Sequence, residues 1–275
     1  METAGVFVGV TLLLYGAASV LYLWLVGGGS ERVREAGVVA MALGLASHTG
    51  AIVSVGVALG RAPFTNLYES LLFWSWAMAG IYLVMARKHR ITALGAFVSL
   101  AALAVLAAAS FIPKGTNAAL LPALRSHWSS IHVTTCLISY ASYALGFGAA
   151  VAYVVQERLL KRKKINSLQK HLPSLDALDQ LAYKMVSIGF PMLTLGVITG
   201  AMWAQSAWDS YWSWDPKETW SLITWLVYAA YLHVRIVHKW RGRWANRLLM
   251  VGFACVLVTF FAVNFLAHGL HRYSW

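Results

Sequence analysis

Charged residues are scarce in this chain of 275 residues, because Asp, Glu, Lys and Arg together make up only 12% of it. A soluble globular domain has about 25% charged residues. Half that fraction, combined with long apolar runs and a hydrophobic content of 59%, excludes an ordinary soluble fold. We therefore expect an all-α integral membrane protein in which residues 1–275 form a single transmembrane domain.

Cysteine is nearly absent as well. The two cysteines, Cys136 and Cys255, each lie inside an apolar run. The sequence contains no CxxC or CxxCH motif and no Cys/His spacing typical of a zinc site. These absences exclude a c-type cytochrome and a dithiol oxidoreductase. We interpret both cysteines as small apolar filling residues.

A cationic face is also missing, although the formal net charge is +12. The Lys and Arg residues lie in loops between apolar runs, so they report membrane topology and not a nucleic-acid partner. The first apolar run, 6–26, follows an acidic start and is long for a signal sequence. We interpret it as a retained membrane span.

The apolar runs predict a polytopic bundle of about eight transmembrane helices, since one span needs about 20 residues. Sequential runs are separated by short loops, and they show no internal repeat. The predicted spans are 4–26, 36–59, 66–86, 91–112, 130–155, 183–203, 219–237 and 246–267.

The basic residues predict the orientation of the bundle. One set of alternate loops holds 16 Lys and Arg residues and the other holds 5, with Lys184 left at a span edge. The richer set is expected to be cytoplasmic, which places both termini outside. The cytoplasmic loop 157–182 contains a basic run and leucines at helical spacing. It predicts either an amphipathic helix on the inner surface or a plain linker.

Tryptophan is concentrated in the external segment 203–218, which reads WAQSAWDSYWSWDPKE. A tryptophan ring is large and its indole N–H needs a hydrogen-bond partner. Packing in a hydrophobic core therefore does not account for four tryptophans in one short segment. We interpret the segment as a platform for a flat amphipathic ligand, built from Trp203, Trp208, Tyr211, Trp212 and Trp214. The alternative is an aromatic belt at headgroup level.

Two histidines are expected at the level of this segment. His132 begins the fifth span and His271 follows the eighth, both at the outer end. Neutral imidazole is a common ligand of haem iron, so two imidazoles beside an aromatic platform suit a bis-His haem site. His127 and His268 are alternatives at the same level.

Two further histidines lie inside predicted spans. His48 is midway along the second span and His233 is towards the end of the seventh. Ionisable residues in spans are functional candidates, although a neutral His bonded to a neighbouring helix is the simpler alternative. His233 follows Asp215 by about 27 Å of helix, on the cytoplasmic side. If both depths bind haem, the sites suggest a path across the membrane. The remaining histidines, His89, His171 and His238, are interpreted as solvated loop residues.

Acidic residues mark two helix starts at the outer side. Asp215 can cap the seventh span, with Pro216 at its first position and Glu218 in the capping-box position. We assign the acidic pair mainly to capping, which would also position the Trp-rich loop. Glu69 marks the start of the third span and is expected to be buried with a partner that the sequence does not reveal.

The segments around these residues resemble the tryptophan-rich "WWD" haem-handling family and, within it, the CcsA (ResC) family of cytochrome c biogenesis system II. The resemblance extends over most of the chain. It rests on Gly196–Ala204, Tyr211–Trp220, the continuation to His233, Pro63–Ser70, Ile131–Val133, Val263–Leu266 and Gly269–His271.

The resemblance implies a function with a membrane partner, CcsB (ResB). Together the two move haem, held non-covalently as b-type haem, to the outer face and attach it to CxxCH of apocytochrome c, as a holocytochrome c synthase (haem lyase). It implies that His132 and His271 ligate the outer haem and His233 ligates haem within the bilayer. It matches His48 to the family histidine that precedes the Pro63–Ser70 segment, and Asp215 belongs to the haem-binding signature. The expected location is a bacterial plasma membrane, or a thylakoid membrane for a plastid homologue.

The sequence departs from the signature at two positions. Met202 stands where a first Trp is common, and Asp209 stands where Gly is usual. Neither removes an expected iron ligand. Two other functions stay open: a haem carrier like CcmC, and a di-haem b-type electron-transfer subunit.

Overall fold

The computed structural model describes residues 2–88, 91, 94–113, 126–163, 168 and 171–262, and within these ranges it contains helices and no strand. This confirms the predicted all-α fold. The helices are α1 (Glu2–Gly27), α2 (Glu31–Leu59), α3 (Leu67–Lys88), α4 (Leu94–Ser110), α5 (His127–Lys161), α7 (Leu175–Trp208), α8 (Pro216–Ile236) and α9 (Arg243–Leu257), which continues into a π-helical turn over Val258–Ala262.

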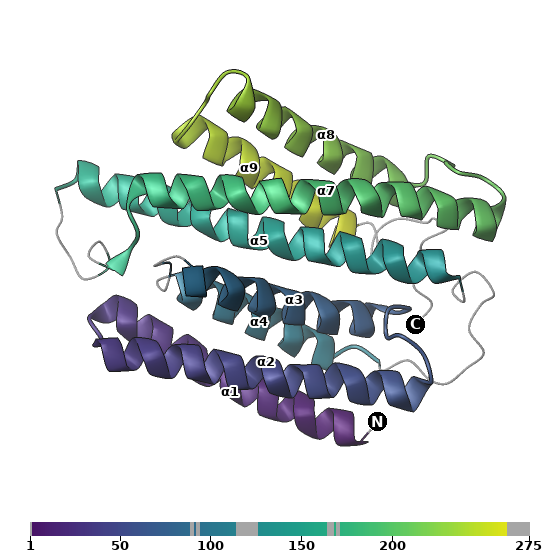
Figure 1. Cartoon of the computed structure of the whole chain (residues 1–275), viewed down its shortest axis with the longest axis horizontal. Coiled ribbons are helices and arrows are strands. Elements are labelled where there is room, and N and C mark those ends of the chain that lie inside the picture. Colours follow the sequence, from purple (N-terminus) through teal and green to yellow (C-terminus); the bar gives the residue numbers. More distant parts are fainter. Residues whose placement is uncertain are drawn as a thin grey trace.

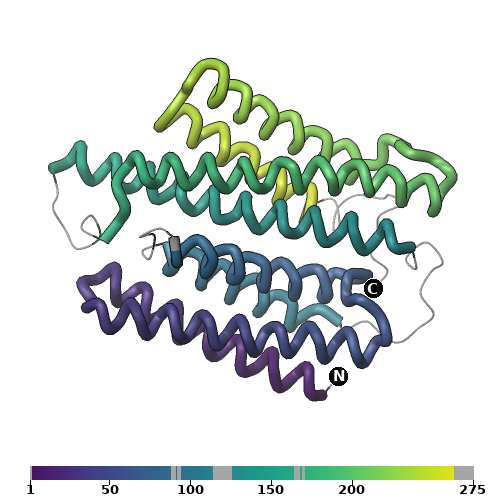
Figure 2. The backbone as a smooth tube through the Cα atoms, viewed as in Figure 1, coloured from purple at the N-terminus to yellow at the C-terminus, as the bar shows by residue number. Residues whose placement is uncertain are grey.

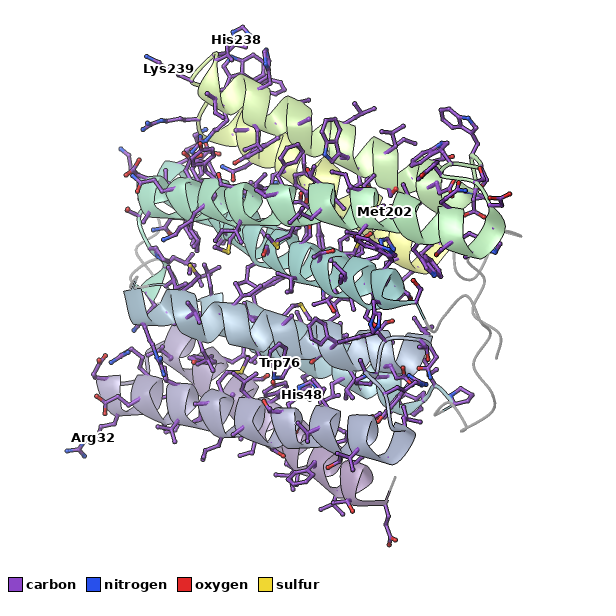
Figure 3. The ribbon with its side chains drawn as sticks, turned by 45° about the vertical axis from the view of Figure 1, so that its right-hand side comes forward. Arg32, His48, Trp76, Met202, His238 and Lys239 are labelled. Carbon is purple, nitrogen blue, oxygen red and sulfur yellow. The ribbon has the colours of Figure 1, made fainter. Side chains whose placement is uncertain are left out.

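Successive helices run in opposite directions, so the connections alternate between the two ends of the bundle (Figure 1). One end carries the connections after α1, α3, α5 and α8, and Arg32 and Lys239 both lie there (Figure 3). We call it the basic end. The opposite end carries the Trp-rich segment, and we call it the outer end. The alternation that the Lys and Arg residues predicted is therefore present in the fold.

Six described helices are long and apolar enough to cross a membrane: α1, α2, α3, α5, α7 and α9 with its π-turn. The other two correspond to the predicted spans 91–112 and 219–237. Helix α4 is apolar but has 17 residues. Helix α8 has 21 residues and is more polar, because it begins with Pro216-Lys217-Glu218 and carries Arg235 near its end. Both lie along the other helices in the bundle (Figure 2).

The helices associate in antiparallel pairs, α1 with α2, α3 with α4, α5 with α7, and α8 with α9. Buried aromatic rings join neighbouring pairs. Tyr22 of α1 meets Tyr82 of α3 edge-on, with ring centroids 5.9 Å apart. Tyr143 of α5 stacks on Tyr228 of α8 at 3.6 Å and 7°. These contacts form one core that runs through all four pairs.

Helix α7 is longer than the predicted span 183–203, because it begins at Leu175 and continues for 34 residues with Pro191 inside it. Ser174 caps its start by accepting a hydrogen bond from the Ala177 N–H. Residues 175–182, which the sequence placed in a cytoplasmic linker or surface helix, are thus the first turns of a long helix. Most of the connection 164–170 lies outside the described residues.

A buried ion pair ties α7, α8 and α9 together at the basic end. Arg235 Nη1 and Nη2 donate to the two carboxylate oxygens of Asp179, at 3.1 and 2.5 Å. The Gly242 N–H donates to the same carboxylate at 2.9 Å, and Arg235 also donates to the Trp240 carbonyl at 2.9 Å. These bonds fix the connection between α8 and α9. Removing one partner would leave a buried, uncompensated charge.

We predict that Asp179→Ala lowers the free energy of unfolding by about 3–5 kcal/mol, since it strands the Arg235 guanidinium. Thermal and denaturant unfolding of the purified protein in detergent would measure this. The matched control is Asp176→Ala on the same helix. Asp176 is exposed and accepts a hydrogen bond only from Gln180 among the described side chains. Its loss should change stability by less than about 1 kcal/mol. Equal effects of the two substitutions would contradict a clamping role for Asp179.

Candidate functional site

The Trp-rich segment lies at the outer end and is partly helical. Trp203 and Trp208 belong to the last turns of α7, and only residues 209–215 form the connection to α8. Trp203 is buried, whereas Tyr211 and Trp214 in the connection are 62% and 69% exposed. The segment thus offers both an anchored aromatic wall and exposed rings.

His132 of α5 lies against this wall. Its ring stacks on the Trp203 ring, with centroids 6.0 Å apart and an interplanar angle of 24°. Its Nδ1 is 2.7 Å from the Gly196 carbonyl oxygen. A carbonyl only accepts hydrogen bonds, so Nδ1 carries the proton and Nε2 carries the lone pair. In this tautomer Nε2 is the ring nitrogen that has the chemistry to ligate a metal.

Two glycines allow α5 to approach α7 at this point. A Cβ at Gly200 would lie 2.6 Å from His132 Nδ1, and a Cβ at Gly196 would lie 2.5 Å from Cys136 Sγ. Both distances are shorter than real contacts allow. The four-residue spacing of the glycines is the small-xxx-small pattern of close helix packing in membranes. It places the Gly196 carbonyl within reach of the imidazole.

The aromatic rings form two groups. Trp203 and Trp208 meet edge-on at 5.0 Å, which extends the stack begun by His132. Trp212 and Trp214 form a second perpendicular pair at 5.8 Å. The Trp212 Nε1–H is buried and has no acceptor within the described part of the chain. A buried indole donor without an acceptor fits a ligand that brings an acceptor of its own.

The connection is held in a strained shape by helix caps. Trp214 has φ 59°, a left-handed conformation that is an outlier for a bulky residue. Asp215 accepts from the Lys217 N–H at 2.9 Å, and Glu218 accepts from the N–H groups of Ser213 and Asp215 at 2.8 and 3.2 Å. The predicted capping box is therefore present. It occupies the Asp215 carboxylate in capping and turns the Trp214 side chain outward.

A second buried carboxylate orders the outer end next to α3. Glu69 is 1% exposed and accepts from Arg61 Nη1 and Nη2 at 2.9 Å each. The Thr65 N–H donates to the same carboxylate at 2.7 Å, and the Asn66 side chain donates to it at 2.9 Å. Arg61 is thus the partner that the sequence did not reveal, and the pair fixes residues 60–66.

The other candidate histidines lie apart from this cluster. His233 is exposed on α8 near the basic end, and its ring is 5.6 Å from that of His238. His48 is fully buried in the middle of α2, with Nδ1 3.2 Å from the Tyr15 hydroxyl (Figure 3). His127 is the first residue of α5. His271 and His268 lie outside the described residues. His132 and His233 therefore lie near opposite ends of the bundle.

Comparison with known proteins adds to this geometry. The family model of the cytochrome c assembly protein matches residues 64–271. The CcsA protein of Synechococcus elongatus is 38% identical over 260 residues, covering 78% of this chain and 80% of its own length. The CcsA protein of Synechocystis is 34% identical over 306 residues, covering 92% and 89%. The chain belongs to the cytochrome c assembly protein family, as a CcsA-like member.

A solved structure supports the fold of this family member. The cytochrome c haem lyase CcmF matches with a TM-score of 0.75 over 94% of this chain, at 18% sequence identity. At that identity the match establishes the fold alone. The chain spans 46% of the CcmF chain, so it corresponds to part of that larger protein.

The structure gives a physical reason for Asp209 at a position where the sequence resemblance leads us to expect Gly. Asp209 ends α7 in the left-handed conformation, with φ 54°. Glycine adopts this conformation without strain, and Asp is one of the few other residues that tolerate it. The Gln205 side chain also donates to Asp209 Oδ1 at 2.8 Å. Asp209 can therefore end the helix in the left-handed conformation that glycine adopts most easily. Met202, the other departure, is 38% exposed beside the buried Trp203.

Sequence reasoning missed the structural role of Gly200. The spacing of Gly196 and Gly200 was visible, but only the fold shows that His132 lies opposite both. We predict that Gly200→Ala costs about 1–3 kcal/mol of stability, because its methyl group overlaps the imidazole. Unfolding in detergent would measure the loss.

The matched control is Gly80→Ala inside α3, where an added Cβ has no atom within 4 Å. That change should be neutral or slightly stabilising, since Ala favours a helix over Gly by about 1 kcal/mol. If both substitutions stabilise the protein, close packing of Gly200 against His132 is refuted.

Proposed function

We propose that this chain carries haem from the basic, cytoplasmic end of the bundle to the outer end. With a CcsB (ResB)-type partner it then presents haem for thioether attachment to the CxxCH motif of apocytochrome c. The observation that carries the proposal is His132, whose imidazole is held by the Gly196 carbonyl and by Trp203 with Nε2 as the lone-pair nitrogen.

The outer haem site comprises His132, the four tryptophans and Tyr211. Trp203 and Trp208 would support one face of the substrate, and the exposed rings of Tyr211 and Trp214 would cover it. The second axial ligand is assigned to His271 from the family resemblance. Haem would be bound there non-covalently, so that it can leave once it is attached to the apocytochrome. Asp215 contributes by holding the connection in shape.

The inner haem site is assigned to His233. Its exposed position on α8 leaves the imidazole available to a neighbouring subunit, which agrees with a second ligand supplied by a CcsB-type partner. His233 and His132 lie near opposite ends of the bundle, so a substrate bound first at one and then at the other crosses the membrane. His48 is buried between α1, α2 and α3, and we assign it no ligand role.

The attachment step adds a cysteine thiol across a vinyl double bond of haem. The sulfur bonds to one vinyl carbon and the thiol hydrogen goes to the other, so the reaction needs no leaving group. No side chain of the described outer cluster is placed as an evident acid or base for this step. The contribution of the chain would be to hold two reactants in position, which can lower the activation free energy by several kcal/mol.

We predict that His132→Ala lowers haem content at the outer site by more than about tenfold. Changing a residue that only supports a metal ligand already costs about 10–100-fold in affinity, so loss of the ligand itself should cost at least as much. Haem at the inner site should be retained, while cytochrome c maturation is lost. A reduced-minus-oxidised absorption spectrum of the protein co-expressed with a CcsB-type partner measures both sites. His127→Ala, one helical turn away, is the control and should resemble wild type. Unchanged outer haem in His132→Ala would falsify the ligand assignment.

We further predict that His233→Ala depletes haem at both sites, because the inner site supplies the outer one. His238→Ala, whose ring neighbours that of His233, serves as the control for local disturbance. If His132→Ala and His233→Ala each lose only the haem of their own site, haem does not pass from one site to the other. That result would favour a di-haem electron-transfer subunit. If the wild-type protein binds haem at both sites but no haem becomes attached to apocytochrome c, a carrier like CcmC would be favoured.

A further inference from the structure

A recess opens between α5 and α9 at the basic end of the bundle, on surface that the haem path does not use. Its volume is about 300 Å³. Polar and apolar side chains share its lining, and the lining residues are Val154, Glu157, Arg158, Arg243, Arg247 and Met250.

Cationic charge in this recess exceeds what the protein neutralises. The Glu157 carboxylate accepts from Arg243 at 2.9 Å and pairs with Lys161 at 3.1 Å. Arg158 and Arg247 are exposed, and neither forms an ion pair within the described part of the chain. Three arginines and one carboxylate therefore line the recess, and that carboxylate is already paired with Arg243 and Lys161. The start of α9 adds partial positive charge, because Gly242 provides no side-chain cap there.

The same recess has apolar walls and an aromatic rim. Val154 and Met250 line it beside the arginines and are half-buried. Trp244 is 67% exposed, and the Arg247 guanidinium lies 5.0 Å from the centroid of its ring. Tryptophan favours the headgroup level of a membrane, so this ring marks the depth at which the recess opens. A small hydrated anion would not use the apolar walls.

We propose that this recess binds an anionic phospholipid of the leaflet at the basic end. Arg158 and Arg247 hold the headgroup phosphate, and Val154 and Met250 contact the start of the acyl chains. Basic pockets between transmembrane helices on the cytoplasmic side are known binding sites for anionic headgroups. The proposal does not depend on haem transport, since it shares no residue with either haem site.

The test measures binding of phosphatidylglycerol and phosphatidylcholine to the purified full chain by native mass spectrometry. The variant Arg158→Gln/Arg247→Gln should bind phosphatidylglycerol about thirtyfold more weakly, because each arginine near a membrane surface contributes about fivefold. The control Arg32→Gln/Arg241→Gln removes two exposed cations from the same end and should reduce binding less than about fivefold. Phosphatidylcholine binding should be weak throughout.

A second variant distinguishes loss of the lipid site from a folding defect, because it is expected to strengthen binding. Glu157→Gln removes the carboxylate that competes with the headgroup, so phosphatidylglycerol should bind about fivefold more tightly. Equal losses in the two double variants would overturn the site in favour of general surface charge. Displacement of phosphatidylglycerol by inorganic phosphate at equal concentration would overturn the lipid in favour of a free anion. Weaker binding in Glu157→Gln would also contradict the proposal.

Discussion

The arrangement of the outer site depends on the close contact between α5 and α7. Apolar burial alone does not hold helices together in a bilayer, because lipid tails are as apolar as the side chains. Here Gly196 and Gly200 bring the two backbones together, and the Gly196 carbonyl then fixes the tautomer and direction of His132. His132 stacks on Trp203, which in turn meets Trp208 edge-on within α7. The Gly196 carbonyl thus holds the imidazole of α5 against an aromatic pair of α7.

Buried charges complete the structure at both ends. Glu69 with Arg61 orders the loop before α3 at the outer end, and Asp179 with Arg235 orders the connection between α8 and α9 at the basic end. Each carboxylate also accepts backbone N–H groups that irregular segments would otherwise leave without partners. At these two places an ion pair therefore satisfies irregular backbone beside a helix end. The middle of the bundle remains helical and apolar.

The sequence predicted the all-α fold, the alternation of the connections and the capping box at Asp215, because these follow from local composition and spacing. It also placed His132 and the Trp-rich segment at one level. It did not predict that α7 begins at Leu175, since polar residues such as Asp176 indicated a separate surface helix or a linker. Arg61 as the partner of Glu69, Arg235 as the partner of Asp179 and the contact of Gly200 with His132 could not be predicted, because they depend on how helices pack.

The lengths of the two helices that carry the outer cluster define its depth. Helices α5 and α7 have 35 and 34 residues, hence lengths of about 50 Å, against a hydrocarbon core of about 30 Å. Helices of this length, if centred on the hydrocarbon core, extend beyond the acyl chains on both sides of a bilayer. His132, in the second turn of α5, then lies at the boundary between lipid and water. At that depth a flat amphipathic molecule can arrive sideways from the membrane and be reached from above by a protein in solution.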